Sequence, residues 1–194
     1  MSRLDSNIRR LMSQRACLDW AAGAVAGLAG PVLEFGLGNG RSYDHLRERL
    51  PGRNIFVFDR EVAAHPDCIP PADRMILGDF RETAPAAAKR FAGKVARVHA
   101  DVGSGDITAS RALAVSLAPH WAAMLADGGL LISDQPIVRD DLLALPHPEG
   151  LPSWYVICRR AARSVRADRH QPLAAGSRPA QAQPSHAKST MTPR

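Results

Sequence analysis

Short apolar runs alternate with helix-like stretches along this chain, and this alternation constrains its fold more than any other feature. The runs are rich in branched and aromatic residues, which favour strands. They span residues 32–35, 55–58, 75–77, 95–100, 130–133 and 154–158. Repeated strand–helix–strand units predict a parallel sheet covered by helices on both faces, with right-handed crossovers. We therefore expect an α/β fold with a doubly wound, mostly parallel sheet of about six strands.

Helices are expected between these runs, over residues 42–50, 82–93 and 107–129, because each stretch ends at a glycine or a Pro-Gly pair. Apolar residues near helical spacing predict a further helix over roughly 6–28. After the fifth strand, the short segment before the last one has room for a single helical turn at 139–145. The sheet is therefore expected to be reduced after the fifth strand, and the direction of its last strand is left open.

The composition fits one globular domain, because the chain has 194 residues of which 45% are hydrophobic. Its formal net charge is +6, and five of these charges fall after residue 160. That segment is rich in Ala, Pro, Ser and Gln, so it cannot bury enough apolar surface to fold. We expect an N-terminal helix packed on the domain (1–30), the folded domain (31–160) and a disordered basic tail (161–194). A solvated tail is the simplest interpretation, and contact with nucleic acid or an acidic partner is the alternative.

The cysteines and the N-terminal segment indicate the cellular location of the protein. Cys17, Cys68 and Cys158 lack the spacing of a zinc site or a disulfide framework, so we expect no metal and reduced thiols in a cytoplasmic protein. Arginines followed by an apolar run give the N-terminus some likeness to a signal peptide, but Asp19 and Trp20 interrupt the approach to that run. No run reaches the roughly 18 apolar residues of a membrane span, so no membrane association is expected.

The segment LEFGLGNGRS, residues 33–42, closes the first strand with glycines at alternate positions. Glycines permit a tight turn and let a ligand approach the backbone, and the helix that follows presents free N–H groups. The dinucleotide fingerprint G-x-G-x-x-G would need its third glycine at position 41, which is Arg. The carboxylate of Glu34 would also repel a pyrophosphate. A cationic ligand without phosphate suits this loop better.

The pattern E-x-G-x-G-x-G in EFGLGNG resembles the cofactor motif of class I S-adenosylmethionine-dependent methyltransferases, and the resemblance extends over about residues 31–160. It implies a Rossmann-like fold, S-adenosylmethionine as the cofactor and a glycine loop along the methionine part. Asp59, at the end of the second strand, corresponds to the acid that binds both ribose hydroxyls. Asp79 and Phe80, after the third strand, look like the adenine contacts. The cofactor-binding residues expected in all are Glu34, Gly36, Gly38, Asn39, Gly40, Ser42, Asp59, Arg60, Gly78, Asp79, Phe80 and Asp101.

The segment HADVGSGD, residues 99–106, follows the fourth strand, where the family places residues that face the substrate. Asp101 lies at the strand end and is the first candidate for a catalytic role, either as a general base or as a contact to cofactor or substrate. Asp134, after the fifth strand, is the second candidate. Asp106 is expected to cap the next helix. The chain lacks the N-P-P-Y type motif of many enzymes that methylate nucleic-acid bases, so nucleic acid is not supported as the acceptor.

Three functions fit these patterns. The first is a small methyltransferase that uses S-adenosylmethionine and an acceptor that the sequence does not identify. The second is an accessory module that binds the cofactor without turnover. The third is an NAD(P)-dependent oxidoreductase, in which Arg60 would suit a 2′-phosphate, although Glu34 and the missing glycine argue against it. The mouth of the site is expected to be open unless the N-terminal helix or a second subunit covers it, so a homo-oligomer is also considered.

Overall fold

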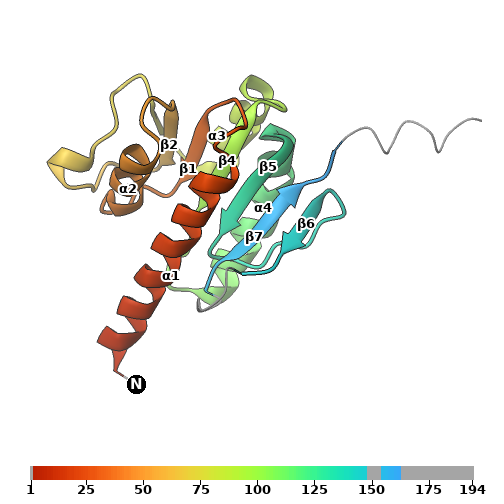
Figure 1. Cartoon of the computed structure of the whole chain (residues 1–194). Coiled ribbons are helices and arrows are strands. Elements are labelled where there is room, and N and C mark those ends of the chain that lie inside the picture. Colours follow the sequence, from red (N-terminus) through yellow and green to blue (C-terminus); the bar gives the residue numbers. More distant parts are fainter. Residues whose placement is uncertain (1, 148–153, 163–194) are drawn as a thin grey trace, which may run out of the picture. The chain divides into compact units, whose positions relative to one another are not determined.

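The computed structural model describes residues 2–147 and 154–162 (Figure 1). Its helices are α1 (Arg3–Ala24), α2 (Arg41–Arg49), the 3-10 turn η1 (Pro66–Cys68), α3 (Phe80–Arg90) and α4 (Ile107–Met124). Its strands are β1 (Val32–Phe35), β2 (Ile55–Asp59), β3 (Met75–Leu77), β4 (Val95–Ala100), β5 (Leu125–Ser133), β6 (Leu142–Leu145) and β7 (Val156–Arg160). Residues 163–194 lie outside the described part, so the prediction of a disordered basic tail stays untested.

The described strands form one seven-stranded sheet in the order β3-β2-β1-β4-β5-β7-β6 (Figure 1). The first five strands along the chain pair in parallel, and β7 pairs antiparallel with both β5 and β6. The expected α/β class and mostly parallel sheet are confirmed. The strand order reverses between β1 and β4, and ligands of open α/β sheets bind at such a point, beyond the carboxyl ends of the strands.

The expected strand count was too low, because residues 142–145 form strand β6 instead of part of a helical turn. Leu142 is buried in the core with Cys158, while the exposed Leu143 lies on the opposite face. Asp141, just before β6, accepts hydrogen bonds from Arg139 and from Arg160 of β7. Pairing with β7 and this carboxylate clamp therefore outweigh the helical propensity of a leucine-rich segment.

Two helical layers cover the sheet. α3 and α4 pack on one face, and α1 and α2 on the other (Figure 1). On the α4 side, Phe35 of β1 stacks on Phe58 of β2 with ring centroids 4.4 Å apart and meets Trp121 edge-on. These rings fix β1 and β2 against α4, so the ends of both strands are held in place.

Helix α1 begins earlier than the sequence pattern suggested, because Ser2 and Asp5 form a capping box at its first turn. Its second half buries Cys17 and Leu18 against the sheet. The backbone carbonyl of Leu18 also accepts a hydrogen bond from the fully buried Arg97 of β4, 3.1 Å away. Burial lowers the pKa of Arg97 to about 10, although the nearby Glu34 carboxylate acts in the opposite direction.

Helix α4 ends at Met124, and β5 begins at Leu125, although the sequence suggested a helix through the two glycines at 128 and 129. Leu125 pairs with Val95 of β4, so the sheet extends across the expected helix end. Asp106 caps α4 through a hydrogen bond from the Ala109 N–H, as expected. None of the described helices is long and apolar enough to cross a membrane.

The clamp at Asp141 generates a stability prediction. Burial would raise the pKa of Asp141, but the hydrogen bonds and charges of Arg139 and Arg160 outweigh it and lower that pKa from 3.8 to about 2. The carboxylate therefore stabilises the fold above its unfolded-state pKa, and this contribution is lost as the pH falls through about 4 towards 2. We expect Asp141→Asn to cost about 1–3 kcal/mol at neutral pH.

Chemical denaturation at several pH values measures this effect. The stability difference between Asp141→Asn and the natural protein should shrink as the medium becomes acidic. Asp140→Asn, which changes the neighbouring exposed carboxylate, is the control and should leave stability nearly unchanged. A difference for Asp141→Asn that stays constant with pH would contradict the clamp.

Candidate functional site

The loop between β1 and α2 depends on glycines because its backbone is left-handed at three positions and packs closely on its neighbours. Gly36 has φ 98°, and a Cβ there would lie 2.2 Å from the carbonyl oxygen of Asp101. Gly40 has φ 82° and caps α2, and a Cβ there would lie 2.5 Å from the Cβ of Cys68. Only glycine fits at these two positions, so the loop packs closely against the end of β4 and the η1 turn.

Glu34 lies beneath this loop rather than at its mouth, because its side chain is fully buried. The Ser42 hydroxyl donates a hydrogen bond to its Oε1 atom, and Nδ1 of His99 lies 3.6 Å from the same atom. Its Oε2 atom has no hydrogen-bond partner among the described residues. Glu34 would therefore influence a cationic ligand through Ser42 or through the electrostatic field of its carboxylate across the loop. The expected contact between Glu34 and such a ligand stays a prediction.

Asp59 joins the end of β2 to the glycine loop. Its Oδ2 atom accepts hydrogen bonds from the backbone N–H groups of Leu37, at 2.7 Å, and Gly38, at 3.2 Å. Its Oδ1 atom accepts one from the N–H of Arg60, at 2.6 Å. The carboxylate therefore holds the loop from below and lies at the strand end where a ribose would be placed.

A first cavity, of about 210 Å³, opens above the glycine loop. The loop residues that line it include Gly36, Gly38, Asn39 and Ser42. Asp101 closes the cavity from the end of β4, and Arg10 and Gln14 of α1 form a further wall. The N-terminal helix is thus part of the site.

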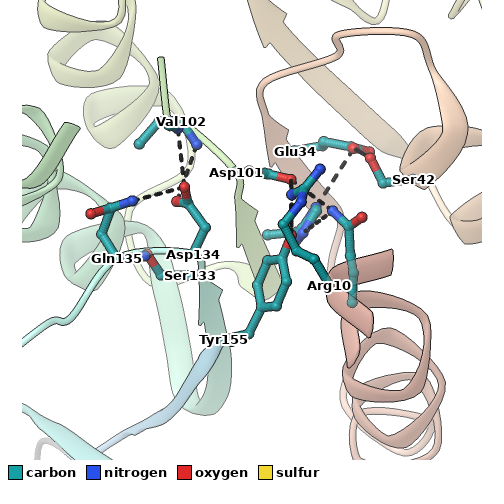
Figure 2. A network of polar contacts seen from close by, with 12 residues as sticks. Arg10, Glu34, Ser42, Asp101, Val102, Ser133, Asp134, Gln135 and Tyr155 are labelled. Carbon is teal, nitrogen blue, oxygen red and sulfur yellow. Dashed lines mark hydrogen bonds and ion pairs between the residues drawn. The ribbon is translucent and has the colours of Figure 1, made fainter. Parts of the chain in front are cut away.

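Asp101 is fixed by three hydrogen bonds that converge on one oxygen, as Figure 2 shows. Oδ2 accepts from Nη1 of Arg10 at 3.1 Å, from the amide of Gln14 at 2.9 Å and from the hydroxyl of Tyr155 at 3.0 Å. Burial raises the pKa of Tyr155, so its hydroxyl stays protonated and donates. These contacts leave Oδ1 available to a ligand in the cavity.

Asp134, after β5, shapes the loop that follows Asp101. The N–H of Val102 donates to its Oδ1 atom, and the N–H of Gly103 and the side-chain amide of Gln135 donate to its Oδ2 atom (Figure 2). Burial raises the pKa of Asp134, and the charge of Asp101 adds to this effect. Both oxygens of Asp134 therefore hold protein groups, whereas Asp101 faces the cavity.

A second cavity, of about 220 Å³, lies beyond Asp59 at the end of β3. Arg60, Asp79, Phe80 and Val102 belong to its lining. Asp79 also caps α3 through a hydrogen bond from the Arg81 N–H, and Phe80 is largely buried. Both residues thus support the fold and also lie where an adenine contact was expected.

Most of the expected cofactor-binding residues meet at this edge of the sheet. The first cavity holds Gly36, Gly38, Asn39, Ser42 and Asp101, and the second holds Arg60, Asp79 and Phe80. Sequence reasoning missed Arg10, Gln14 and Tyr155, which come from α1 and the segment before β7. The helical spacing of apolar residues in α1 predicted only a buried face, and a polar Gln within that face was the one available signal.

The described residues contain no group of three or more His, Cys, Asp or Glu side chains placed to hold a metal ion. The site combines a glycine loop, carboxylates at successive strand ends and a helix that contributes Arg10. This fold and this site define a class I S-adenosylmethionine-dependent methyltransferase, with S-adenosylmethionine as its cofactor.

A family model described as S-adenosyl-L-methionine methyltransferase matches residues 1–160, and the chain belongs to this family. Among solved structures, an S-adenosyl-L-methionine methyl transferase from Silicibacter pomeroyi DSS-3 is 46% identical, covers 83% of this chain and 99% of its own, and has a TM-score of 0.79. TrmN from Thermus thermophilus is similar in fold alone, at 16% identity over 72% of this chain and 48% of its own, with a TM-score of 0.50. A search of curated proteins found no match.

The position of Asp59 generates a binding prediction. We expect Asp59→Ala to weaken binding of S-adenosylhomocysteine about ten- to a hundredfold, because it removes a charged acceptor for the ribose hydroxyls. It should also lower the melting temperature, since the N–H groups of Leu37 and Gly38 lose their partner. Calorimetry and thermal melting measure the two effects. Asp67→Ala, at an exposed carboxylate in the next loop, is the control, and unchanged affinity in a folded Asp59→Ala would contradict the ribose assignment.

Proposed function

We propose that this protein is an enzyme that transfers a methyl group from S-adenosylmethionine to an acceptor at the cavity beside Asp101. The observation that carries the proposal is the charge arrangement of the first cavity. Asp101 lies on one side and Arg41 lies at the start of α2, with the glycine loop between them. The methionine part of the cofactor carries an ammonium and a carboxylate, so this cavity is complementary to it.

The residues of the two cavities divide the cofactor between them. The close approach of Gly36 to the Asp101 carbonyl, where a Cβ would clash, holds the glycine loop against the end of β4. Ammonium recognition is assigned to Asp101 and carboxylate recognition to Arg41. Ribose recognition is assigned to Asp59, and adenine recognition to the cavity lined by Asp79 and Phe80.

The bound cofactor would supply an electrophilic methyl group on a sulfonium. The protein contributes alignment, because methyl transfer is an in-line displacement whose rate depends on the approach of the nucleophile. Three donors on one oxygen of Asp101 favour a fixed, charged carboxylate that binds a cation. Asp134 holds the N–H groups of Val102 and Gly103, so it keeps the loop beside the acceptor in one conformation. The role of Asp101 as a general base remains the alternative.

A cytoplasmic location is part of the proposal, and it is supported by Cys17, Cys68 and Cys158, which are all free thiols. The accessory module and the oxidoreductase receive no support from the family match. Thermal melting discriminates the cofactors: S-adenosylhomocysteine should raise the melting temperature, and NADPH should not. Transfer of labelled methyl groups into fractionated cell extract tests turnover, and its absence despite cofactor binding would favour the accessory module.

Asp101→Asn tests the ammonium contact. The change keeps the shape of the side chain and removes its charge, so we expect affinity for S-adenosylhomocysteine to fall about tenfold or more. Glu61→Gln, at an exposed position in the β2–β3 loop, is the control for loss of one negative charge. Calorimetry at constant ionic strength measures both variants. Equal affinity in Asp101→Asn and the natural protein would remove Asp101 from the cofactor site.

A further inference from the structure

The charges around the first cavity do not balance once the cofactor is considered. Arg10, Arg41 and Asp101 are the charged residues of its lining, so two cations face one anion. Behind the lining, Asp59 and Asp134 use both of their oxygens to bind protein N–H groups. The buried charges of Glu34 and Arg97 are opposite in sign. Among the residues that line the cavity, positive charge is therefore in excess, and its two arginines carry it.

S-adenosylmethionine would add to this excess. Its ammonium matches Asp101 and its carboxylate matches Arg41, as proposed above, which leaves the sulfonium and Arg10 without a negative partner. Two positive charges next to the reacting methyl group would attract an acceptor that brings a negative charge. A neutral or cationic acceptor would leave both uncompensated.

Arg10 is placed to receive such a group. Its Nη1 atom makes both of its bonds, to Asp101 at 3.1 Å and to the Tyr155 hydroxyl at 3.0 Å (Figure 2). The Nε–H and Nη2–H groups are not used in these bonds, and 39% of the side chain is exposed. An ammonium at Oδ1 of Asp101 would share the single negative charge of this carboxylate with Arg10 at Oδ2, while Tyr155 also holds the guanidinium at the cavity wall.

We propose that Arg10 binds an anionic group, a carboxylate or a phosphate, on the methyl acceptor. This inference rests on the proposed function and names the class of its acceptor. A guanidinium presents its N–H groups in a planar fork that matches both kinds of anion. In the structure only Nη1 of Arg10 bonds to Asp101 and Tyr155, so the Nε–H and Nη2–H groups remain for the acceptor's anion.

Titration of small anions into the full-length protein tests the proposal without a known acceptor. Inorganic phosphate and acetate are the probes, each added at constant ionic strength to cofactor-free protein and to protein saturated with S-adenosylmethionine. We expect the loaded protein to bind at least one probe about threefold or more tightly than the free protein. Protein loaded with S-adenosylhomocysteine, which lacks the sulfonium charge, should give a smaller enhancement.

Two variants assign the effect to one side chain. Arg10→Gln should abolish the enhancement, whereas Arg9→Gln, at the neighbouring exposed arginine of α1, should retain it. Equal anion binding by Arg10→Gln and the natural protein, or by free and loaded protein, would overturn the proposal. A stronger enhancement for phosphate indicates a phosphorylated acceptor, and a stronger one for acetate indicates a carboxylic acid. A melting curve of each variant verifies folding.

Labelled methyl transfer gives an independent outcome. Small molecules of a cell extract, separated on an anion exchanger at neutral pH, are incubated with the enzyme and labelled S-adenosylmethionine. Label is expected in compounds that the exchanger retains, and label confined to unretained compounds would overturn the anionic acceptor while leaving methyl transfer intact. Failure of S-adenosylmethionine to bind in the first titration would instead overturn the proposed function, and this inference with it.

Discussion

Three hydrogen-bond donors converge on one carboxylate oxygen of Asp101, and the geometry of the site depends on this convergence. Two donors, Arg10 and Gln14, come from the N-terminal helix, and Tyr155 precedes the last strand. Segments from both ends of the folded domain are thereby fixed to the end of β4. Because the donors are partly or fully buried, each bond is stronger than it would be in water, and the loss of one leaves its partner unsatisfied.

A chain of polar contacts extends from Asp101 below the glycine loop. Gln14 lies 3.5 Å from Nε2 of His99, and Nδ1 of His99 lies 3.6 Å from Glu34, which accepts a hydrogen bond from Ser42. Glu34 of β1 and Asp101, which follows β4, are thus linked through the buried imidazole of His99. Glu34 and His99 are direct partners in the register of these strands, so the sheet itself sets their separation. The loop and the end of β4 are therefore coupled through Glu34 and His99, two side chains buried away from the cavity.

Much of this arrangement could be predicted from sequence. Parallel strands bring their carboxyl ends to one edge of the sheet, so acidic residues at those ends gather at the same edge. Asp59 and Asp101 were found in this way. The signal for β6 was hidden, since RDDLLAL has helical propensity and becomes a strand through pairing with β7 and the clamp between Asp141 and Arg160. Arg10 was missed for a similar reason. A basic residue on an amphipathic helix indicates a solvated face, and its partner lies 91 residues away in sequence.

The same electrostatics bear on turnover. Before transfer, the sulfonium and Arg10 would both attract an anionic acceptor, and transfer removes the charge on sulfur while the protein's own charges stay unchanged. The methylated product then faces one positive charge fewer than the acceptor did, so its attraction to the cavity weakens. Arg10 can keep its bond to Oδ2 of Asp101 throughout, because an ammonium can use Oδ1. A fixed arginine beside a cofactor that loses one positive charge would therefore favour acceptor binding before transfer and product release after it.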